Sequence, residues 1–175
     1  MSHLKIPVGA QDHVQGAAGA AVTLVEYGDY QCPYCGQAYP IVKQLQARMG
    51  AKMRLVFRNF PLAEMHPYAM GAAEVAEAAA LQGKFWEMHD RLYEHQDELD
   101  PDSLMQHARH LHLDLKKLED AIRGGGIAER IKADFNGGVR SGVNGTPSFY
   151  INGAKFDGNW TVAAEFLAAL EEAAG

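Results

Sequence analysis

The chain has 175 residues, 47% of them hydrophobic, which suits one globular domain with a sizeable core. Its net charge of −6 argues against a nucleic-acid partner and a basic membrane-binding surface. It has neither an apolar run of transmembrane length nor the apolar core of a secretory signal at its N-terminus, so we expect a cytoplasmic protein, or an exported one whose signal was trimmed.

The first part of the chain predicts a strand–helix–strand unit. Residues 1–21 hold few core candidates and predict an extended lead-in, with a short edge strand near residues 4–8. The apolar stretch Val22–Tyr27 predicts a buried strand. Apolar residues at helical spacing follow, predicting a helix kinked at Pro40, and Met53–Arg58 predicts a second strand. A helical crossover of this length favours a parallel pair of strands.

The next part of the chain predicts a block of helices. Asp100 and Asp114 are good N-caps, and Gly124-Gly125-Gly126 ends a helix. The predicted helices are 67–82, 84–96, a third that begins at Asp100-Pro101, and 115–123. A last segment, 127–140, returns to the sheet.

The C-terminal part predicts a hairpin and a helix. Phe149–Ile151 and Ala154–Phe156 flank Asn152-Gly153, the strongest short hairpin signal. Thr161 is a fair N-cap for a final helix. This order predicts an α/β fold with one sheet interrupted by an inserted helical subdomain. The expected parts are a lead-in (1–21), a first sheet part (22–62), the helical insertion (63–140) and a second sheet part (141–175).

The only two cysteines, Cys32 and Cys35, stand at the predicted turn from strand to helix. A helix N-terminus offers unpaired N–H groups and a positive dipole potential, which favour the reactive thiolate. Residues three apart on a helix have Cβ atoms roughly 5–6 Å apart, whereas a relaxed disulfide needs about 3.5–4.5 Å. We therefore expect a somewhat strained, reducible bridge, with Pro33 suited to the first helical position. A Cys-x-x-Cys beside a βαβ pattern indicates a thioredoxin-like redox fold.

Four motifs stand in order along the chain: VEYGDYQ leading into CPYC at 25–35, VFRNFPL at 56–62, QGKFWEMH at 82–89 and GVNGTP at 142–147. Together they resemble the DsbA-like branch of the thioredoxin superfamily, bacterial thiol–disulfide oxidoreductases with a helical insertion in the thioredoxin fold. The similarity spans roughly residues 20–172.

The resemblance implies roles for individual residues. Cys32 would be the exposed attacking thiol and Cys35 the buried resolving one. Thr146-Pro147 would be a cis peptide bond opposite the cysteines, with flanking peptide groups that pair with an extended substrate. Glu26 matches a buried acidic position that would relay the proton of Cys35.

Tyr34 is a departure from the best-known oxidising member of the branch, which has histidine there. Active-site cysteines of the superfamily range in pKa from about 3.5 in DsbA to about 7 in thioredoxin. Without the histidine, we expect an intermediate pKa for Cys32 and a less strongly oxidising couple. Proline and tyrosine between the cysteines do not fix the direction of electron flow.

Several alternative interpretations remain open. The cysteines could be inert, or be part of a zinc site completed by the histidines between 107 and 112; we favour redox chemistry and expect no metal. Glu26 could be solvated at a strand end. Phe85, Trp86, Met88 and Tyr93 could line a substrate groove, but their helical spacing favours a place in the core.

We therefore expect a thiol–disulfide oxidoreductase that uses Cys32 and Cys35 without a bound cofactor. Its partners would be protein or small-thiol substrates and a redox partner, with no nucleic acid and no membrane, and the protein would be a monomer. One alternative is a glutathione-dependent isomerase or transferase on the same scaffold, which would have no need of Cys35. The other is a non-enzymatic binding module that senses redox state.

Overall fold

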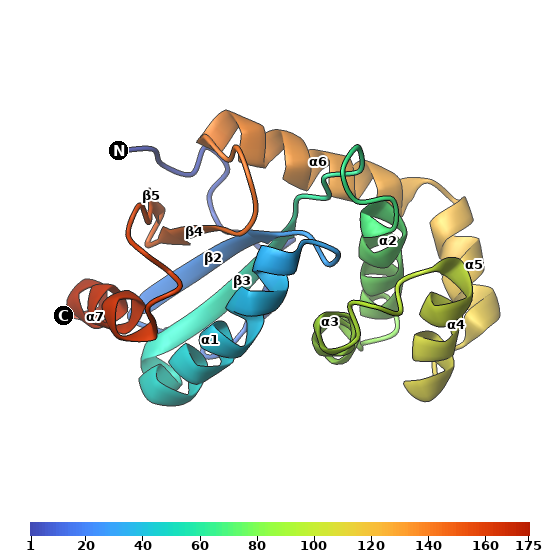
Figure 1. Cartoon of the computed structure of the whole chain (residues 1–175), viewed down its shortest axis with the longest axis horizontal. Helices are drawn as coiled ribbons and strands as arrows, with labels where there is room; N and C mark the ends of the chain where they lie inside the picture. The colour runs from blue at the N-terminus through green and yellow to red at the C-terminus, as the bar shows by residue number, and fades with distance from the viewer.

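The computed structural model describes residues 1–175 and is built on a five-stranded sheet in the order β1-β3-β2-β4-β5 (Figure 1). β2 and β3 are parallel, as predicted, and every other neighbouring pair is antiparallel. The strands are β1 (His13–Gln15), β2 (Val22–Gly28), β3 (Met53–Asn59), β4 (Ser148–Ile151) and β5 (Ala154–Lys155).

Helix α1 (Pro33–Met49) is the crossover between the two parallel strands. It forms because apolar residues recur at helical spacing, and its buried positions face the sheet. Pro40 lies inside α1 and does not end it. A short 3-10 turn, Gly50–Lys52, then leads into β3. Because only four residues separate the end of β2 from the start of α1, the N-terminus of α1 lies next to the C-terminal end of that strand.

Five helices lie between β3 and β4 and form the predicted helical insertion; in Figure 1, α2 to α5 make a lobe beside the sheet. The predicted N-caps are confirmed: Asp100 accepts a hydrogen bond from Ser103 N at 3.2 Å, and Asp114 accepts one from Lys117 N at 3.0 Å. The last helix returns and packs against β3. The helices are α2 (Ala69–Ala80), α3 (Phe85–Glu94), α4 (Pro101–His110), α5 (Leu115–Arg123) and α6 (Gly126–Ser141).

The predicted hairpin is confirmed. Asn152 and Gly153 join β4 to β5 with φ angles of 48° and 84°, the two positive values that a type I′ turn requires. The final helix, α7 (Ala163–Ala174), packs against α1 and β2. The predicted N-cap Thr161 is wrong, because its hydroxyl donates to Asn159 Oδ1 at 2.6 Å and no side chain caps α7.

The N-terminal segment departs from the prediction. The edge strand is β1 rather than residues 4–8, which form no strand. Leu4 N donates to Gly153 O at 2.9 Å, and the neighbouring His3 forms an isolated bridge. The strand β1 was missed because three residues with one apolar member, Val14, carry no readable alternation.

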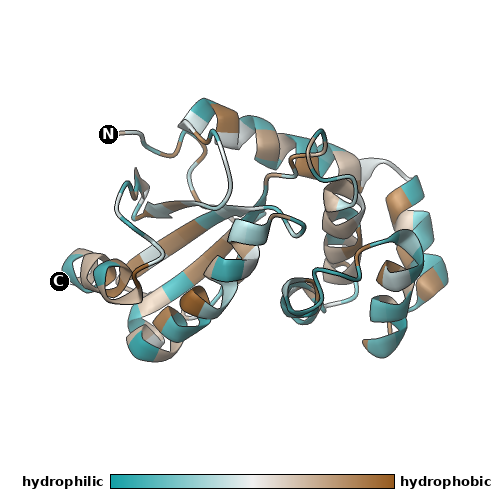
Figure 2. Ribbon diagram, in the orientation of Figure 1, coloured by the Kyte–Doolittle hydropathy of each residue, from teal (hydrophilic) through white to brown (hydrophobic).

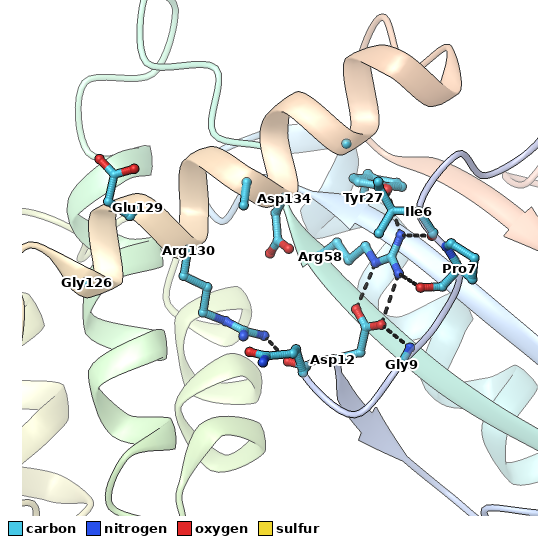
Figure 3. Close-up of a pocket in the computed structure, with 13 residues that line it drawn as sticks. Ile6, Pro7, Gly9, Asp12, Tyr27, Arg58, Gly126, Glu129, Arg130 and Asp134 are labelled. Atoms are coloured by element: carbon cyan, nitrogen blue, oxygen red, sulfur yellow. Dashed lines mark hydrogen bonds and ion pairs between the residues drawn. The ribbon is translucent and has the colours of Figure 1, made fainter.

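Arg58 on β3 fastens this segment to the sheet, as Figure 3 shows. Its Nε and Nη2 donate to the two carboxylate oxygens of Asp12 at 2.8 and 3.0 Å. Nη1 donates to Ile6 O at 2.9 Å and to the Tyr27 hydroxyl at 3.0 Å, and Nη2 donates to Pro7 O at 3.1 Å. Bidentate, charge-assisted hydrogen bonds of this kind are strong, so one buried side chain replaces the missing strand pairing.

Apolar side chains fill both faces of the sheet and the interior of the helical lobe. One cluster lies between the sheet and the helices α1 and α7, a second lies on the opposite face, and a third fills the lobe and reaches the cysteines. Figure 2 shows hydrophobic residues along the central strands and polar ones on the outer helical faces. No helix combines the length and apolar composition needed to cross a bilayer. Of the four α3 side chains predicted as core, Phe85, Met88 and Tyr93 are buried, whereas Trp86 is only partly buried and packs against the same cluster.

Candidate active site

The turn between β2 and α1 is held by the buried carboxylate of Asp29. Its Oδ1 accepts from Gln31 N at 2.8 Å, and its Oδ2 accepts from Leu62 N at 2.9 Å and lies 2.8 Å from His66 Nδ1. The Asp29 carbonyl accepts from Cys32 N at 3.1 Å. Asp29 therefore fixes the backbone that leads into the first cysteine and ties it to the loop after β3.

Cys32 is the N-cap of α1, where the first N–H groups of the helix have no helical partners. A hydrogen bond from the Cys35 side chain is the main influence that lowers the pKa of Cys32, to about 5. The Thr146 side chain and the N–H groups of Cys35 and Tyr34 lower it further, against a desolvation that raises it. This pKa lies between those of DsbA and thioredoxin, as expected from Tyr34.

Cys35 has the opposite acidity. Burial raises its pKa well above the ordinary value, and the hydrogen bond with Cys32 and the charge of Glu26 raise it further. Neither cysteine is in a disulfide, so the structure shows the dithiol state. Two chemically identical side chains three residues apart are therefore a stabilised thiolate and a protonated, buried thiol.

The expectation of an exposed Cys32 is wrong for this state. The residue is only 3% exposed, and Cys35 is 0% exposed. The Thr146 carbonyl oxygen lies 3.5 Å from the Cys32 sulfur. Cys32 therefore belongs to the buried cluster of the helical lobe while its sulfur keeps one polar contact, with the Thr146 carbonyl.

The Thr146–Pro147 peptide bond is cis, as the resemblance implies. The loop that contains it borders a groove of about 410 Å³, with the first turn of α1 on the other side. Tyr34 is 62% exposed at this groove. Phe156 and Trp160, from the chain after β5, contribute aromatic surface.

Glu26 lies on the face of β2 that packs against α1, because successive strand residues alternate and Leu24 on that face joins the cluster below α1 and α7. It is 3% exposed and its Oε1 has no hydrogen-bond partner, so a carboxylate solvated at a strand end is excluded. Burial raises the pKa of Glu26 to about 8. The charge of Glu26 in turn raises the pKa of Cys35.

Gln96, in the loop after α3, is a site residue that the sequence did not reveal. Its Nε2 donates to Tyr30 O at 2.8 Å and to Cys32 O at 2.9 Å. A Cβ at Gly36 would collide with the Gln96 amide, so glycine there gives the amide room. No periodicity or motif marks a loop residue 64 positions from its partner.

His107, considered above as a metal ligand, has both ring nitrogens engaged in the helical lobe. Its Nδ1 accepts from Arg91 Nε at 2.9 Å, and its Nε2 lies 2.8 Å from Glu98 O. Burial lowers the pKa of His107. These contacts give the side chain a structural role between α3 and α4.

A larger cavity of about 690 Å³ lies on the opposite face of the sheet, between the N-terminal segment and α6 (Figure 3). Its wall includes the Arg58–Asp12 ion pair and the Asp134 carboxylate. Burial raises the pKa of Asp134, which accepts from the Asn59 backbone at 3.0 Å. None of the site residues predicted from the sequence lines this cavity.

Comparison with known families identifies one match. Residues 9–172 match the family model described as thioredoxin. Among solved structures, a thioredoxin-like oxidoreductase from Silicibacter pomeroyi is similar, with a TM-score of 0.83 and 29% identity over 94% of this chain and 93% of that one. The fold of alpha-DsbA1 from Wolbachia pipientis is also similar, with a TM-score of 0.85 and 20% identity over 98% of this chain and 94% of that one.

Curated relatives with higher identity are longer proteins. Residues of this chain are 46% identical over 173 positions to the Na(+)/H(+) antiporter NhaA 1 of Salinispora arenicola. The match covers 98% of this chain and 26% of the antiporter. The chain therefore spans about a quarter of the length of the curated relatives that it matches.

Proposed function

The chain belongs to the thioredoxin family, and we propose that it is a DsbA-like thiol–disulfide oxidoreductase that works through Cys32 and Cys35 without a bound cofactor. The observation that carries the proposal is the opposite acidity of the two thiols at the start of α1. A thiolate at neutral pH attacks disulfides, and a protonated, buried neighbour waits to resolve the product.

The reductive cycle follows from this pair. The Cys32 thiolate attacks a substrate disulfide, forms a mixed disulfide and expels one substrate sulfur as a thiolate. Cys35 then loses its proton and attacks the Cys32 sulfur; the Cys32–Cys35 bond forms and the second substrate sulfur leaves. The oxidative direction is the reverse sequence, begun by a substrate thiolate.

Glu26 is the proposed acceptor of the Cys35 proton. Its pKa of about 8 lies near neutral pH, where a general base works efficiently. A carboxylate with an ordinary pKa would be a poorer proton acceptor for a thiol whose own pKa is raised. Burial thus gives Glu26 and Cys35 closer proton affinities.

The proposed substrates are extended peptides that carry a disulfide or a thiol. Peptide groups flanking Pro147 can pair with an extended chain, and the groove beside them offers Tyr34, Phe156 and Trp160 to apolar side chains. Aromatic surface of this kind binds peptides through buried area.

The direction of electron flow depends on the compartment. Thiol–disulfide enzymes range from about −270 mV for thioredoxin to about −120 mV for DsbA. A couple between about −120 and −230 mV would rest reduced in a cytosol poised at about −220 to −320 mV, and would act there as a reductase or isomerase. In an exported setting it would rest oxidised and introduce disulfides.

Equilibration of the purified protein with glutathione, combined with insulin reduction, tests the proposal. We expect a reduction potential between those of thioredoxin and DsbA, and loss of insulin reduction in Cys32→Ser. Equal activity of the wild type and Cys32→Ser would contradict an oxidoreductase. Undiminished turnover in Cys35→Ser would instead favour a glutathione-dependent enzyme.

A second proposal concerns the partner. Because relatives that share 46–47% of their matched residues with this chain are named Na(+)/H(+) antiporters, we propose that this redox domain serves an antiporter of that kind. The test is to express Cys35→Ser in the source cells, isolate membranes and identify proteins bound to Cys32 by a mixed disulfide. Recovery of an antiporter supports this partner; recovery of water-soluble proteins alone contradicts it.

A further inference from the structure

Three polar groups meet on one face of β2. Glu26 and Gly28 are two residues apart on that strand, so their Cβ directions coincide. A Cβ at Gly28 would lie 2.7 Å from the Tyr93 hydroxyl oxygen. The Tyr93 hydroxyl of α3 therefore reaches the same face of the strand as the Glu26 carboxylate, and Cys35 of α1 belongs to the same buried cluster as Tyr93.

The Tyr93 ring is held in place by its neighbours. Its centroid lies 4.9 Å from that of Tyr30, 5.5 Å from that of Tyr39 and 5.1 Å from that of His89. Tyr93 is 6% exposed. A ring packed on three sides has little freedom to turn, so the position of its hydroxyl is set by the core.

The hydroxyls of the neighbouring tyrosines have partners, whereas that of Tyr93 has none. Tyr30 lies 3.0 Å from His89 Nδ1, and Tyr39 donates to Glu94 at 3.0 Å. The buried Tyr93 hydroxyl and Glu26 Oε1 both lack a hydrogen-bond partner. Buried polar atoms without partners cost about 1–3 kcal/mol each, so two of them at one place call for an explanation.

The groups facing Glu26 differ in what they can do. The charge of Glu26 raises the pKa of Cys35 on α1, of Tyr93 on α3 and of Tyr30 in the turn before α1, and His89 lies beside Tyr93 on α3. Burial lowers the pKa of His89 to about 3, so it is neutral. Burial raises the pKa of Tyr93, with the charges of Cys35 and Glu26 adding to the rise, so it keeps its proton. The Tyr93 hydroxyl thus stays protonated and is free to donate a hydrogen bond.

We propose that the Tyr93 hydroxyl is a positioning residue that donates a hydrogen bond to the Glu26 carboxylate, directly or through one bridging water. A water at such a site has the two or more polar partners it needs. The bond forms when Glu26 is ionised and holds the carboxylate toward Cys35. The inference rests on the proposed function, since it gives Glu26 its orientation for taking the Cys35 proton.

The proton step is then fully specified. The Cys35 S–H bond breaks and its proton goes to Glu26, while the sulfur's electron pair forms the bond to Cys32. The bond between Cys32 and the substrate breaks, and the substrate leaves with that electron pair as a thiolate. Tyr93 keeps its own proton throughout and contributes only the hydrogen bond.

The test is the resolution rate of a preformed mixed disulfide on Cys32, followed against pH in wild type, Tyr93→Phe and Tyr39→Phe. Tyr93→Phe keeps the ring and removes the donor, so we expect resolution at pH 7 to slow three- to tenfold. We also expect the rising limb of the pH profile to move to higher pH, and the infrared band of the protonated Glu26 carboxyl, assigned with Glu26→Gln, to titrate at higher pH. Tyr39→Phe removes a hydroxyl from the same aromatic group and should change neither readout.

The inference would be overturned if Tyr93→Phe resolved the mixed disulfide within about twofold of the wild-type rate and its Glu26 titrated within about 0.2 pH units of the wild-type value. If Tyr93→Phe does not fold, incorporation of ring-fluorinated tyrosine at position 93 replaces it. The more acidic phenol strengthens the donor, so the Glu26 titration must move to lower pH, and an unchanged titration refutes the hydrogen bond. Either of these contradicting results would concern Tyr93 alone, because the proposed function is tested separately by Cys32→Ser.

Discussion

The Cys32 sulfur lies 3.5 Å from the carbonyl oxygen of Thr146, a contact between residues 114 positions apart in the sequence. The helical insertion lies between them in the chain, yet the contact joins the segments that adjoin the paired strands β2 and β4. Substrate chemistry at Cys32 therefore depends on a loop that belongs to the second sheet part.

Gly28→Ala should destabilise the protein. The added Cβ would lie 2.5 Å from Phe57 Cε2 and 2.7 Å from the Tyr93 hydroxyl oxygen. Overpacking of this kind costs about 1–3 kcal/mol, which urea unfolding would measure. Gly19→Ala is the control, because nothing lies within 4 Å of its added Cβ. Equal stability of the two variants would show that β2 tolerates a side chain at position 28.

Glu26→Gln should stabilise the protein increasingly at high pH. The folded pKa of about 8 exceeds the unfolded value of 4.5, so the folded state of the wild type retains a proton that the unfolded state loses. The unfolding free energy of the wild type therefore falls as pH rises from about 4.5 to 8. Glu26→Gln has no carboxyl to ionise, so its unfolding free energy does not fall in this way. Above pH 8 it should exceed that of the wild type by at most about 5 kcal/mol, at 1.36 kcal/mol for each unit of pKa shift.

Chemical denaturation at several pH values measures this difference, with the exposed Glu119→Gln as the matched control. Parallel pH dependences of wild type and Glu26→Gln would mean that the carboxyl is not perturbed. The same variant should slow resolution by Cys35, so that stability and activity change in opposite directions.

Trp160→Ala should weaken peptide use without altering the couple. Trp160 lines the groove beside Pro147, and neither cysteine is among the residues that line it. We expect kcat/KM for a disulfide-containing peptide to fall about three- to tenfold, as loss of an aromatic contact predicts, with an unchanged glutathione equilibrium. Leu81→Ala, at a residue 72% exposed and outside that groove, serves as control. A shifted reduction potential would place the effect at the cysteines instead.

Arg58→Ala should loosen the N-terminal segment. The Arg58–Asp12 pair is nearly buried, with 4% and 10% of the side chains exposed. Removing one partner of a buried ion pair costs about 3–5 kcal/mol. Proteolysis should then cut within residues 1–15 sooner than in wild type. The surface pair of Lys116 and Asp120 offers a control, since Lys116→Ala should cost at most about 1 kcal/mol. A loss of unfolding free energy in Arg58→Ala that is smaller than about 1 kcal/mol would contradict the anchoring role.

Local chemistry made much of the fold predictable. The Asn152-Gly153 turn and the caps Asp100 and Asp114 depend on neighbours within a few residues, and all three were predicted correctly. Strands β2 and β3 were readable because continuous apolar runs mark strands buried on both faces.

The features that were missed depend on distant partners. The covering of Cys32 by Thr146, the Gln96 contact with the active-site turn and the Arg58 anchor of the N-terminal segment each join residues tens of positions apart. Composition and periodicity describe one segment at a time, so they carry no signal for such contacts. The burial of Glu26 was implied by the resemblance, but its lack of a hydrogen-bond partner emerged only from the packing of three elements.

The most direct test of the account is the titration of the Cys32 thiol in the reduced protein, followed by thiolate absorbance with Cys32→Ser as the blank. We expect a transition near pH 5, since Cys35 and the first N–H groups of α1 stabilise the anion. A transition near the ordinary cysteine value of about 8.5 would contradict it, because Cys32 would then have no more thiolate character than a free cysteine.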